Sequence, residues 1–261
     1  MIDIEGLCKR FRTRGLSGPR WWGRRTERPD VQAVSELDLH ARDGRITGLL
    51  GANGAGKTTT LRLLAGLISP DRGRMAVDGI DVASRPREAL ARMGMLSDAR
   101  GLYPRLTARE NIVYFGALNG MPRDAAEARA DTLAAALDMK PLLDRRTAGF
   151  SQGERMKTAL ARALVHDPAN VVLDEPTNGL DVLATRALRE TLRWLRLPEG
   201  GAKCIVFSTH IMQEVERLCD DVIVLAGGRV VARGSVAELL ARTGESDFED
   251  AFVRLAFGAG R

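Results

Sequence analysis

Apolar runs and amphipathic patterns alternate along the chain and predict a mostly parallel, doubly wound α/β fold. Short apolar runs typical of buried strands lie at residues 46–50, 93–96, 171–175 and 204–208. Apolar side chains at helical spacing lie between them, at residues 58–68, 151–164 and 184–195. Strands that alternate with helices in this way pair in parallel, and the helices cover both faces of the sheet.

Other segments show the alternation and the turn residues of antiparallel strands. Residues 2–7 and 34–39 alternate between apolar and polar positions, and the second segment is typical of an edge strand. Residues 75–82 and 222–232 each predict a hairpin around a glycine-containing turn.

A region of helical character interrupts the strands. A capping box from Thr107 to Glu110 opens one helix, and an alanine-rich helix follows at 124–137. We therefore divide the chain into a core, an inserted helical subdomain and a tail expected to dock on the body as an amphipathic helix. These parts span residues 1–96 with 146–246, residues 97–145, and residues 247–261.

Length and composition narrow the class of protein. A chain of 261 residues can bury a full core. No apolar run approaches the roughly 20 residues that cross a bilayer, and the start of the chain is unlike a signal peptide, so we expect a soluble chain. Cys8, Cys204 and Cys219 lack metal-binding spacing, and we interpret them as reduced thiols of ordinary core residues.

Most of the formal net charge of +5 comes from one segment, residues 12–30. This segment has six arginines against two acids, together with Trp21, Trp22 and several glycines and prolines, which indicates a loop. A solvated insertion explains the composition. The alternative is a surface that meets anionic lipid headgroups or a membrane partner, with the tryptophans at the interface.

The motif G-x-x-x-x-G-K-T occupies residues 51–58, between a predicted strand and a predicted helix. A phosphate-binding loop has this arrangement, because glycines 51, 54 and 56 permit backbone conformations closed to other residues and N–H groups converge on phosphate. Lys57 is expected to reach the β- and γ-phosphates, and the Thr58 hydroxyl to ligate Mg²⁺. The predicted nucleotide-binding residues are Gly51, Ala52, Asn53, Gly54, Ala55, Gly56, Lys57, Thr58 and Thr59.

Two adjacent acids, Asp174 and Glu175, end the apolar strand at 171–175. Asp174 can hold Mg²⁺ beside Thr58, and Glu175 can orient the attacking water or accept its proton. Taken alone, the two acids fit a surface turn equally well. With a phosphate loop upstream, they predict a hydrolytic site.

Five ordered motifs resemble those of the ATP-binding subunits of ABC transporters. They are GANGAGKT at 51–58, FSQGE at 150–154, VVLDE at 171–175, NGLD at 178–181, and His210 after a strand. The run GLYPRLTARENI at 101–112 makes the chain most similar to ABC-2 type exporters of the sodium-efflux (NatA-like) kind. The resemblance implies a P-loop NTPase with the ABC ATPase fold: a mostly parallel core, an antiparallel β subdomain and an inserted helical subdomain.

The resemblance also implies roles for single residues. Phe11 would stack on adenine, which an aromatic face suits. Asp181 would lie across a dimer interface near the partner's phosphate loop, and His210 would contact the γ-phosphate and help to position water. Without the resemblance, a core aromatic is the alternative for Phe11, and a His at a strand end, such as His210, is usually structural.

The signature residues Ser151, Gln152, Gly153 and Glu154 would bind the γ-phosphate of ATP held by a second protomer, at a helix N-terminus. Helix capping by Ser151 and Glu154 explains the same residues and is compatible with this role. FSQGE departs from the usual LSGGQ, because Glu154 brings a charge toward phosphate. If Glu154 turns back to cap the Ser151 N–H, the repulsion is reduced, and we expect slower or more partner-dependent hydrolysis.

Asp98 is a second departure, because the family usually has a glutamine there that contacts Mg²⁺ and senses the membrane subunit. A carboxylate binds Mg²⁺ at least as well as an amide, but it repels the γ-phosphate when the metal is absent. We therefore expect this contact to depend more strongly on the metal.

The resemblance implies an ATPase subunit that uses ATP and Mg²⁺ and dimerises around ATP with a second copy, expected to be identical. It would couple through residues 97–145 to an integral membrane permease, and the transporter is expected to be an exporter. Its location would be cytoplasmic, on the inner face of the cell membrane, with no nucleic-acid partner. One alternative is a soluble ABC-type ATPase acting on nucleic acid or the ribosome, which the positive charge favours weakly. A small phosphate-loop kinase is a further alternative, but it explains neither the signature nor His210.

Overall fold

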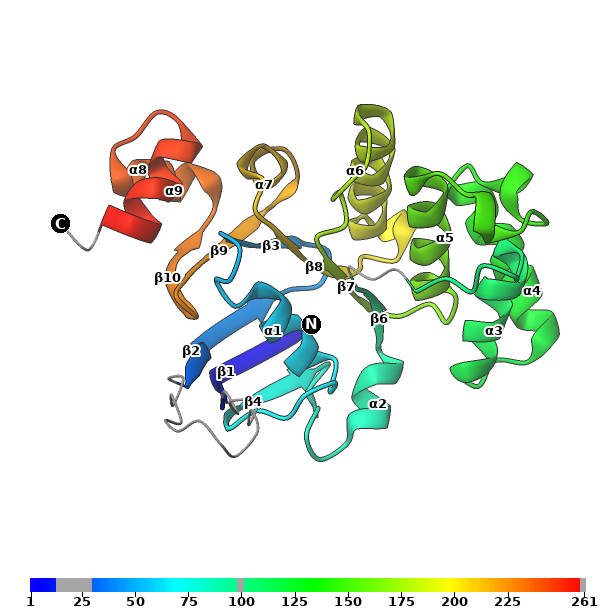
Figure 1. Ribbon diagram of the computed structural model, residues 1–261, viewed down its shortest axis with the longest axis horizontal. Helices are drawn as coiled ribbons and strands as arrows, with labels where there is room; N and C mark the ends of the chain where they lie inside the picture. The colour runs from blue at the N-terminus through cyan, green and yellow to red at the C-terminus, as the bar shows by residue number, and fades with distance from the viewer. Residues whose placement is uncertain (13–29, 98–100, 259–261) are drawn as a thin grey trace, which may run out of the picture.

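The computed structural model describes residues 1–12, 30–97 and 101–258. A six-stranded sheet lies at its centre, with the strand order β10-β9-β3-β8-β7-β6 (Figure 1). Strand β10 pairs antiparallel with β9, and the other neighbours pair in parallel. The strands are β3 (Ile46–Gly51), β6 (Met93–Leu96), β7 (Asn170–Asp174), β8 (Cys204–Thr209), β9 (Asp221–Ala226) and β10 (Arg229–Gly234). The mostly parallel sheet predicted from the apolar runs is confirmed.

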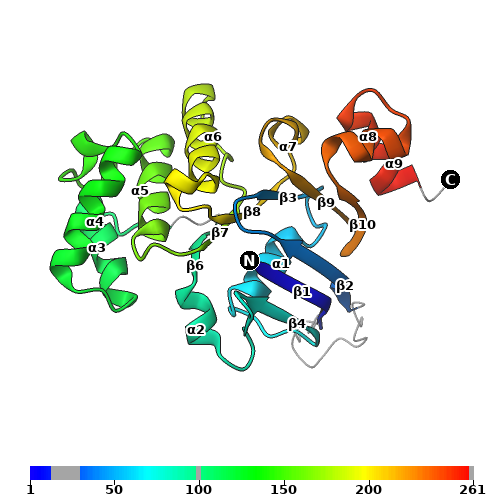
Figure 2. The ribbon, with the colours of Figure 1, turned by 180° about the vertical axis from the view of Figure 1, so that it is seen from behind.

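A second, antiparallel sheet lies on one side of the central sheet, with helix α1 (Lys57–Leu64) close to it (Figures 1 and 2). Its order is β2-β1-β4-β5, so β2 is an edge strand, as the alternation predicted. The strands are β1 (Ile2–Phe11), β2 (Val31–Ala41), β4 (Arg72–Val77) and β5 (Ile80–Asp81). Apolar side chains of both sheets and of α1 form one buried cluster, to which the central strands contribute alternate residues such as Leu49, Val172 and Val206.

Helices α6 (Val182–Arg196) and α7 (Met212–Leu218) lie on the opposite side of the central sheet (Figures 1 and 2). The alternate residues of the central strands face the side of α6 and α7. Val171 and Leu173 lie in one buried cluster with Leu188 and Leu192 of α6. Helix α7 is too short to show a full amphipathic repeat, and the sequence pattern did not predict it.

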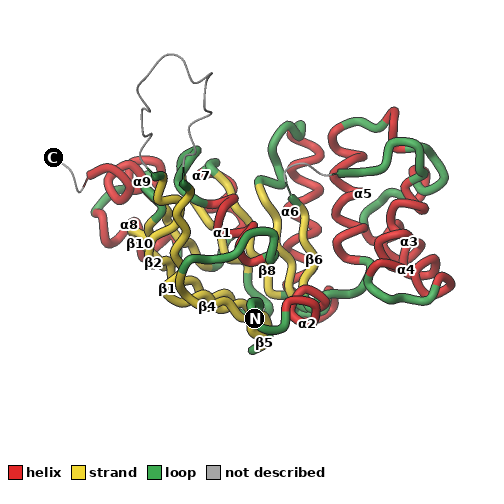
Figure 3. The backbone as a smooth tube through the Cα atoms, turned by 60° about the horizontal axis from the view of Figure 1, so that its bottom comes forward, coloured by secondary structure: helices red, strands yellow, loops and turns green. Residues whose placement is uncertain are grey.

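The inserted helices gather at one end of the molecule, away from the antiparallel sheet (Figure 3). A short α2 (Pro86–Ala91) precedes β6, and α3 (Ala108–Leu118), α4 (Arg123–Ala136) and α5 (Gln152–Leu164) form the group. Single 3₁₀ turns lie at Lys140–Leu142, Thr147–Gly149 and Pro198–Gly200. The predicted capping box of α3 is present, since Thr107 and Glu110 each bond the other's backbone N–H.

The chain closes with α8 (Val236–Thr243), which Ser235 caps, and α9 (Phe248–Phe257). Phe248 and Phe252 are buried in a cluster with Val215 and Val222, so the tail docks as predicted. Within the described residues, no helix combines the length and the apolar character needed to cross a membrane. Cys8, Cys204 and Cys219 are free thiols.

Docking of α9 should contribute measurably to stability. Phe248 is 1% exposed, so Phe248→Ala should lower the free energy of unfolding by about 3–5 kcal/mol, because it leaves a cavity under the helix. Val253 on the same helix is 50% exposed, and Val253→Ala is the matched control, expected to cost well under about 1 kcal/mol. Urea unfolding of both variants measures the difference, and equal effects would show that the helix does not contribute through burial.

Candidate functional site

The predicted phosphate loop follows β3 and ends at α1, and two of its three glycines have left-handed backbones. Gly54 has φ 82° and Gly56 has φ 104°, which side chains with a Cβ adopt only with strain. Gly51 differs from our expectation, because its φ is not positive. A Cβ on Gly51 would lie 2.6 Å from the Leu225 carbonyl oxygen, so close packing against β9 requires this glycine.

Lys57 begins α1 and is 4% exposed. Its ammonium donates to the carbonyl oxygens of Gly51 (2.8 Å) and Ala52 (3.3 Å), and lies 3.4 Å from Glu175 Oε1. The loop therefore wraps a buried cation that faces one carboxylate. A cation held this way at a helix N-terminus is suited to bind phosphate oxygens.

Thr58 and Asp174 meet at the carboxyl edge of the central sheet, where Thr58 follows β3 and Asp174 ends β7, with β8 between these two strands. Thr58 Oγ1 donates to Asp174 Oδ1 at 3.1 Å, and Ser208 Oγ donates to the same oxygen at 2.6 Å. Asp174 is 2% exposed, so these two hydroxyls satisfy a carboxylate that would be costly to bury alone. The pairing predicted from the sequence is thus formed, and Ser208 is an addition.

Glu175 has a left-handed backbone with φ 44°, which is uncommon for a residue with a side chain. Its N–H donates to both the hydroxyl (3.0 Å) and the carbonyl oxygen (3.2 Å) of Ser208. His210 Nδ1 lies 3.4 Å from Glu175 Oε1. Glu175 is therefore a strained carboxylate between an ammonium and an imidazole, an arrangement often found where a site needs a fixed geometry.

Phe11 ends β1 and is 40% exposed, with the Lys9 ammonium 5.7 Å from its ring centroid. Asp71, which follows α1 in the chain, holds this end of the strand in place. Its carboxylate accepts from the Arg10 N–H (2.6 Å) and from Lys9 Nζ (3.1 Å), and the Arg10 N–H lowers the pKa of Asp71 most. The aromatic residue is thus tied to the region of the phosphate loop helix.

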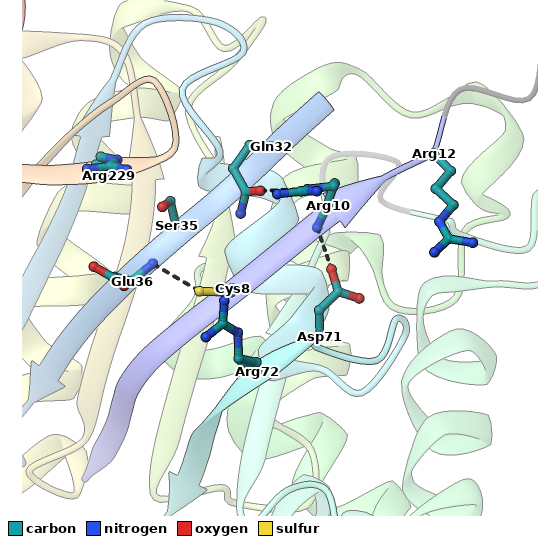
Figure 4. Close-up of a pocket in the computed structure, with 9 residues that line it drawn as sticks. All are labelled: Cys8, Arg10, Arg12, Gln32, Ser35, Glu36, Asp71, Arg72 and Arg229. Carbon is teal, nitrogen blue, oxygen red and sulfur yellow. Dashed lines mark hydrogen bonds between the residues drawn. The ribbon is translucent and has the colours of Figure 1, made fainter. Parts of the chain in front are cut away.

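A cavity of about 800 Å³ lies on the antiparallel sheet beside this anchor (Figure 4). Arg10 reaches across it to Gln32 Oε1 at 3.1 Å, and the Glu36 N–H donates to Cys8 Sγ at 3.3 Å. Its lining mixes arginines with Glu36 and Asp71 and contains no residue of the phosphate loop. The cavity is therefore separate from the phosphate chemistry.

The signature residues begin α5. Ser151 Oγ accepts from the Glu154 N–H at 3.2 Å, and Glu154 Oε2 accepts from the Ser151 N–H at 2.7 Å. Arg145 donates to Glu154 Oε1 at 3.0 Å. The Ser151 N–H, and after it Arg145, lower the pKa of Glu154. Glu154 therefore turns back as a cap, as considered from the sequence, and its charge is partly balanced.

Asp181 caps α6 by accepting from the Ala184 N–H at 2.8 Å. It lines a cavity of about 560 Å³ together with all four signature residues. The cavity contains no residue of the phosphate loop, so the predicted site residues form two separate groups in one chain. Asp98 and residues 13–29 lie outside the described residues.

Two contributors were missed from the sequence, namely Ser208 and Asp71. Ser208 lies near the carboxyl end of β8, which pairs with β7. A polar residue at this end of an apolar strand is a signal that could have indicated a site residue. Asp71 lies in a turn, where an acid has an ordinary explanation, and no local signal marks its long-range bonds to β1.

Comparison with known proteins adds to this geometry. A family model described as ABC transporter matches residues 34–178. The ABC transporter ATP-binding protein NatA of Bacillus subtilis (strain 168) is 42% identical over 224 residues, covering 85% of this chain and 90% of the relative. The Nod factor export ATP-binding protein I of Burkholderia lata is 42% identical over 211 residues, covering 81% of this chain and 68% of the relative.

Solved structures agree on the fold. The ATP binding subunit of an ABC transporter aligns with TM-score 0.79 and 26% identity, covering 97% of this chain and 98% of that one. A dimeric bacterial ABC transporter cassette aligns with TM-score 0.76 and 22% identity, covering 90% and 98%, and at this identity it supports the fold alone.

The balanced charge of Glu154 predicts a pH-dependent contribution to stability. The bonds from Ser151 and Arg145 favour the ionised carboxylate, so the pKa of Glu154 is lower in the folded chain than in the unfolded chain. The contribution is complete above the unfolded-state pKa and is lost as the pH falls through the lowered one. Glu154→Gln should therefore destabilise the chain at about pH 7 and much less in strong acid, at about pH 2.5.

Urea unfolding of wild type and Glu154→Gln at both pH values measures this difference. Glu5→Gln, at an exposed position on β1, is the control, and its small effect should not follow the same pH dependence. A Glu154→Gln effect of equal size at both pH values would contradict the role of the charge.

Proposed function

Because this chain belongs to the ABC transporter ATP-binding family, we propose that it hydrolyses ATP within a pair of ATPase copies and thereby powers a membrane exporter. The family and the ATPase activity follow from the matched model and the extensive identity. Relatives named for transport and for Nod factor export favour a transporter subunit over an ATPase acting on nucleic acid or the ribosome.

The observation that carries the proposal is the cluster of Lys57, Glu175 and His210 at the carboxyl ends of the parallel strands. Lys57 would hold the phosphates, and Glu175 would accept a proton from the attacking water. His210 lies against the same carboxylate and would help to orient the water and the γ-phosphate. Phe11 would stack on the base at the anchored end of β1.

The residues at the phosphate loop fit Mg²⁺. Thr58 Oγ1 and Asp174 Oδ1 are 3.1 Å apart and are the hard oxygen donors that this ion prefers. In the described part of the chain, no cluster of three or more His, Cys, Asp and Glu side chains that could hold a metal ion is found. Bound Mg²⁺ would neutralise phosphate charge, and Asp98 is proposed as a further ligand.

A second copy completes the proposed site. Residues 151–154 and Asp181 line a cavity apart from the phosphate loop, so they would face ATP held by another protomer. The dimeric cassette described above shares this fold, and we propose a pair of the same kind here. Closure of the pair on ATP, and its release after hydrolysis, would drive a permease at the inner face of the membrane through the helices of residues 97–145.

Replacing the proposed general base should separate ATP binding from hydrolysis. Glu175→Gln should lower kcat at least about hundredfold, since the amide accepts no proton, while ATP binding persists. ATP should then hold the variant as a dimer in size-exclusion chromatography. Glu88→Gln, an exposed change on α2, should behave as wild type in both assays. Wild-type turnover by Glu175→Gln would contradict the assigned base.

The permease can be sought with the same variant. Tagged Glu175→Gln protein with Mg²⁺-ATP, isolated in detergent from native membranes, should retain a multi-span membrane protein, because the ATP-closed pair cannot cycle. The same preparation without ATP is the control. Recovery of ribosomes or nucleic acid, with no membrane protein, would overturn the transporter assignment.

A further inference from the structure

Glu214 is a buried carboxylate on α7, 6% exposed, and the mechanism above does not use it. Burial raises the pKa of Glu214, and the hydroxyl bond from Thr177 is the strongest opposing influence. A buried carboxylate lowers the stability of the fold unless hydrogen bonds compensate for the lost hydration. The two hydroxyls that bond to Glu214 indicate what this carboxylate does.

Both bonding partners belong to segments that carry proposed catalytic side chains. Thr177 Oγ1 donates to Glu214 Oε2 at 2.7 Å, and Thr177 follows Glu175 by two residues. Thr209 Oγ1 lies 3.5 Å from the same oxygen, and Thr209 directly precedes His210. One carboxylate oxygen therefore connects the segment after β7 with the segment after β8.

The segment after β7 needs such an anchor. Glu175 has a left-handed backbone, which is strained for a residue with a side chain, and surrounding bonds must hold it. Ser208 holds the Glu175 N–H on one side. On the other side, the tight turn formed by Asn178 N–H to Glu175 O (3.2 Å) is held through the hydroxyl of Thr177.

The segment after β8 is held in the same way. The Ile211 N–H donates to Thr209 Oγ1 at 3.0 Å, which leaves the hydroxyl proton of Thr209 directed at Glu214. The His210 side chain itself is 41% exposed and lies 3.4 Å from Glu175. The bonds of Thr209, the preceding residue, therefore help to set the backbone position of His210.

We propose that Glu214 is a positioning residue for ATP hydrolysis, which fixes Glu175 relative to His210 through the hydroxyls of Thr177 and Thr209. The inference rests on the proposed function, since it concerns the same site. It predicts a loss in turnover rather than in ATP binding, because Glu214 bonds to Thr177 and Thr209, which belong neither to the phosphate loop nor to the signature residues. A small misplacement of a catalytic group is enough to slow the chemical step.

Steady-state ATP hydrolysis by the purified full-length chain tests the proposal. Glu214→Ala should lower kcat about tenfold and change KM for ATP less than about twofold. Glu214→Gln keeps an acceptor oxygen and should retain at least about half of wild-type kcat. Glu216→Ala, an exposed glutamate on the same helix, should match wild type.

A double-mutant comparison separates positioning from a general loss of structure. In a His210→Ala background, Glu214→Ala should lower kcat less than about twofold further, because the group it positions is gone. If Glu214→Ala does not fold, Thr177→Val keeps the side-chain shape and should still lower kcat, about threefold, at unchanged KM.

Three results would overturn the inference: wild-type kcat in both Glu214→Ala and Thr177→Val, an undiminished effect in the His210→Ala background, or an equal loss in Glu216→Ala. Wild-type protein that hydrolyses no ATP would overturn the proposed function as well. If wild type hydrolyses ATP and the Glu214 and Thr177 variants have the same kcat as wild type, the inference is overturned and the proposed function stands.

Discussion

The parallel register of β3, β8 and β7 is the constraint on which the site depends. It places Ser208 beside Asp174 on one side and beside Leu49 on the other, so the phosphate loop after β3 opens next to both acids. The buried Asp174 carboxylate then finds two hydroxyls, from Thr58 and Ser208. A slip of one residue in β7 would turn Asp174 to the other face and leave those hydroxyls and the carboxylate unpaired, at a cost of several kcal/mol. The register and the polar network therefore stabilise each other.

The two groups of site residues are built in different ways. At the end of β7 the chain is strained, since Glu175 is left-handed and is held there by the hydroxyl and carbonyl of Ser208. At the start of α5 the chain is relaxed, because Ser151 and Glu154 form an ordinary capping box worth about 1 kcal/mol. Of these two segments, only the one proposed for proton transfer has a left-handed residue with a side chain. The signature residues, by contrast, would use only the N–H groups and the positive dipole end of the α5 N-terminus.

The sequence predicted the features that depend on local chemistry. The strand, glycine loop and helix around Lys57 follow from spacing alone, as do the capping boxes begun by Thr107 and Ser151. Features that depend on which strands become neighbours were not predicted. Ser208 acquires its role only through pairing with β7, and Asp71 acquires its role only through the approach of β1. Gly51 was predicted for the wrong reason, because contact with Leu225, and not its own backbone angle, requires glycine.

The contacts of Lys57 suggest how binding and chemistry are connected in the proposed function. Its ammonium is shared between loop carbonyls and Glu175 Oε1, at 2.8 Å from Gly51 O and 3.4 Å from the carboxylate. Phosphate oxygens would compete with Glu175 for this cation, because both are anions that can use the same three donors. A phosphate that takes the ammonium would release Glu175 from Lys57 and leave it in contact with His210. In this arrangement the substrate itself would help to turn a structural ion pair into a general base.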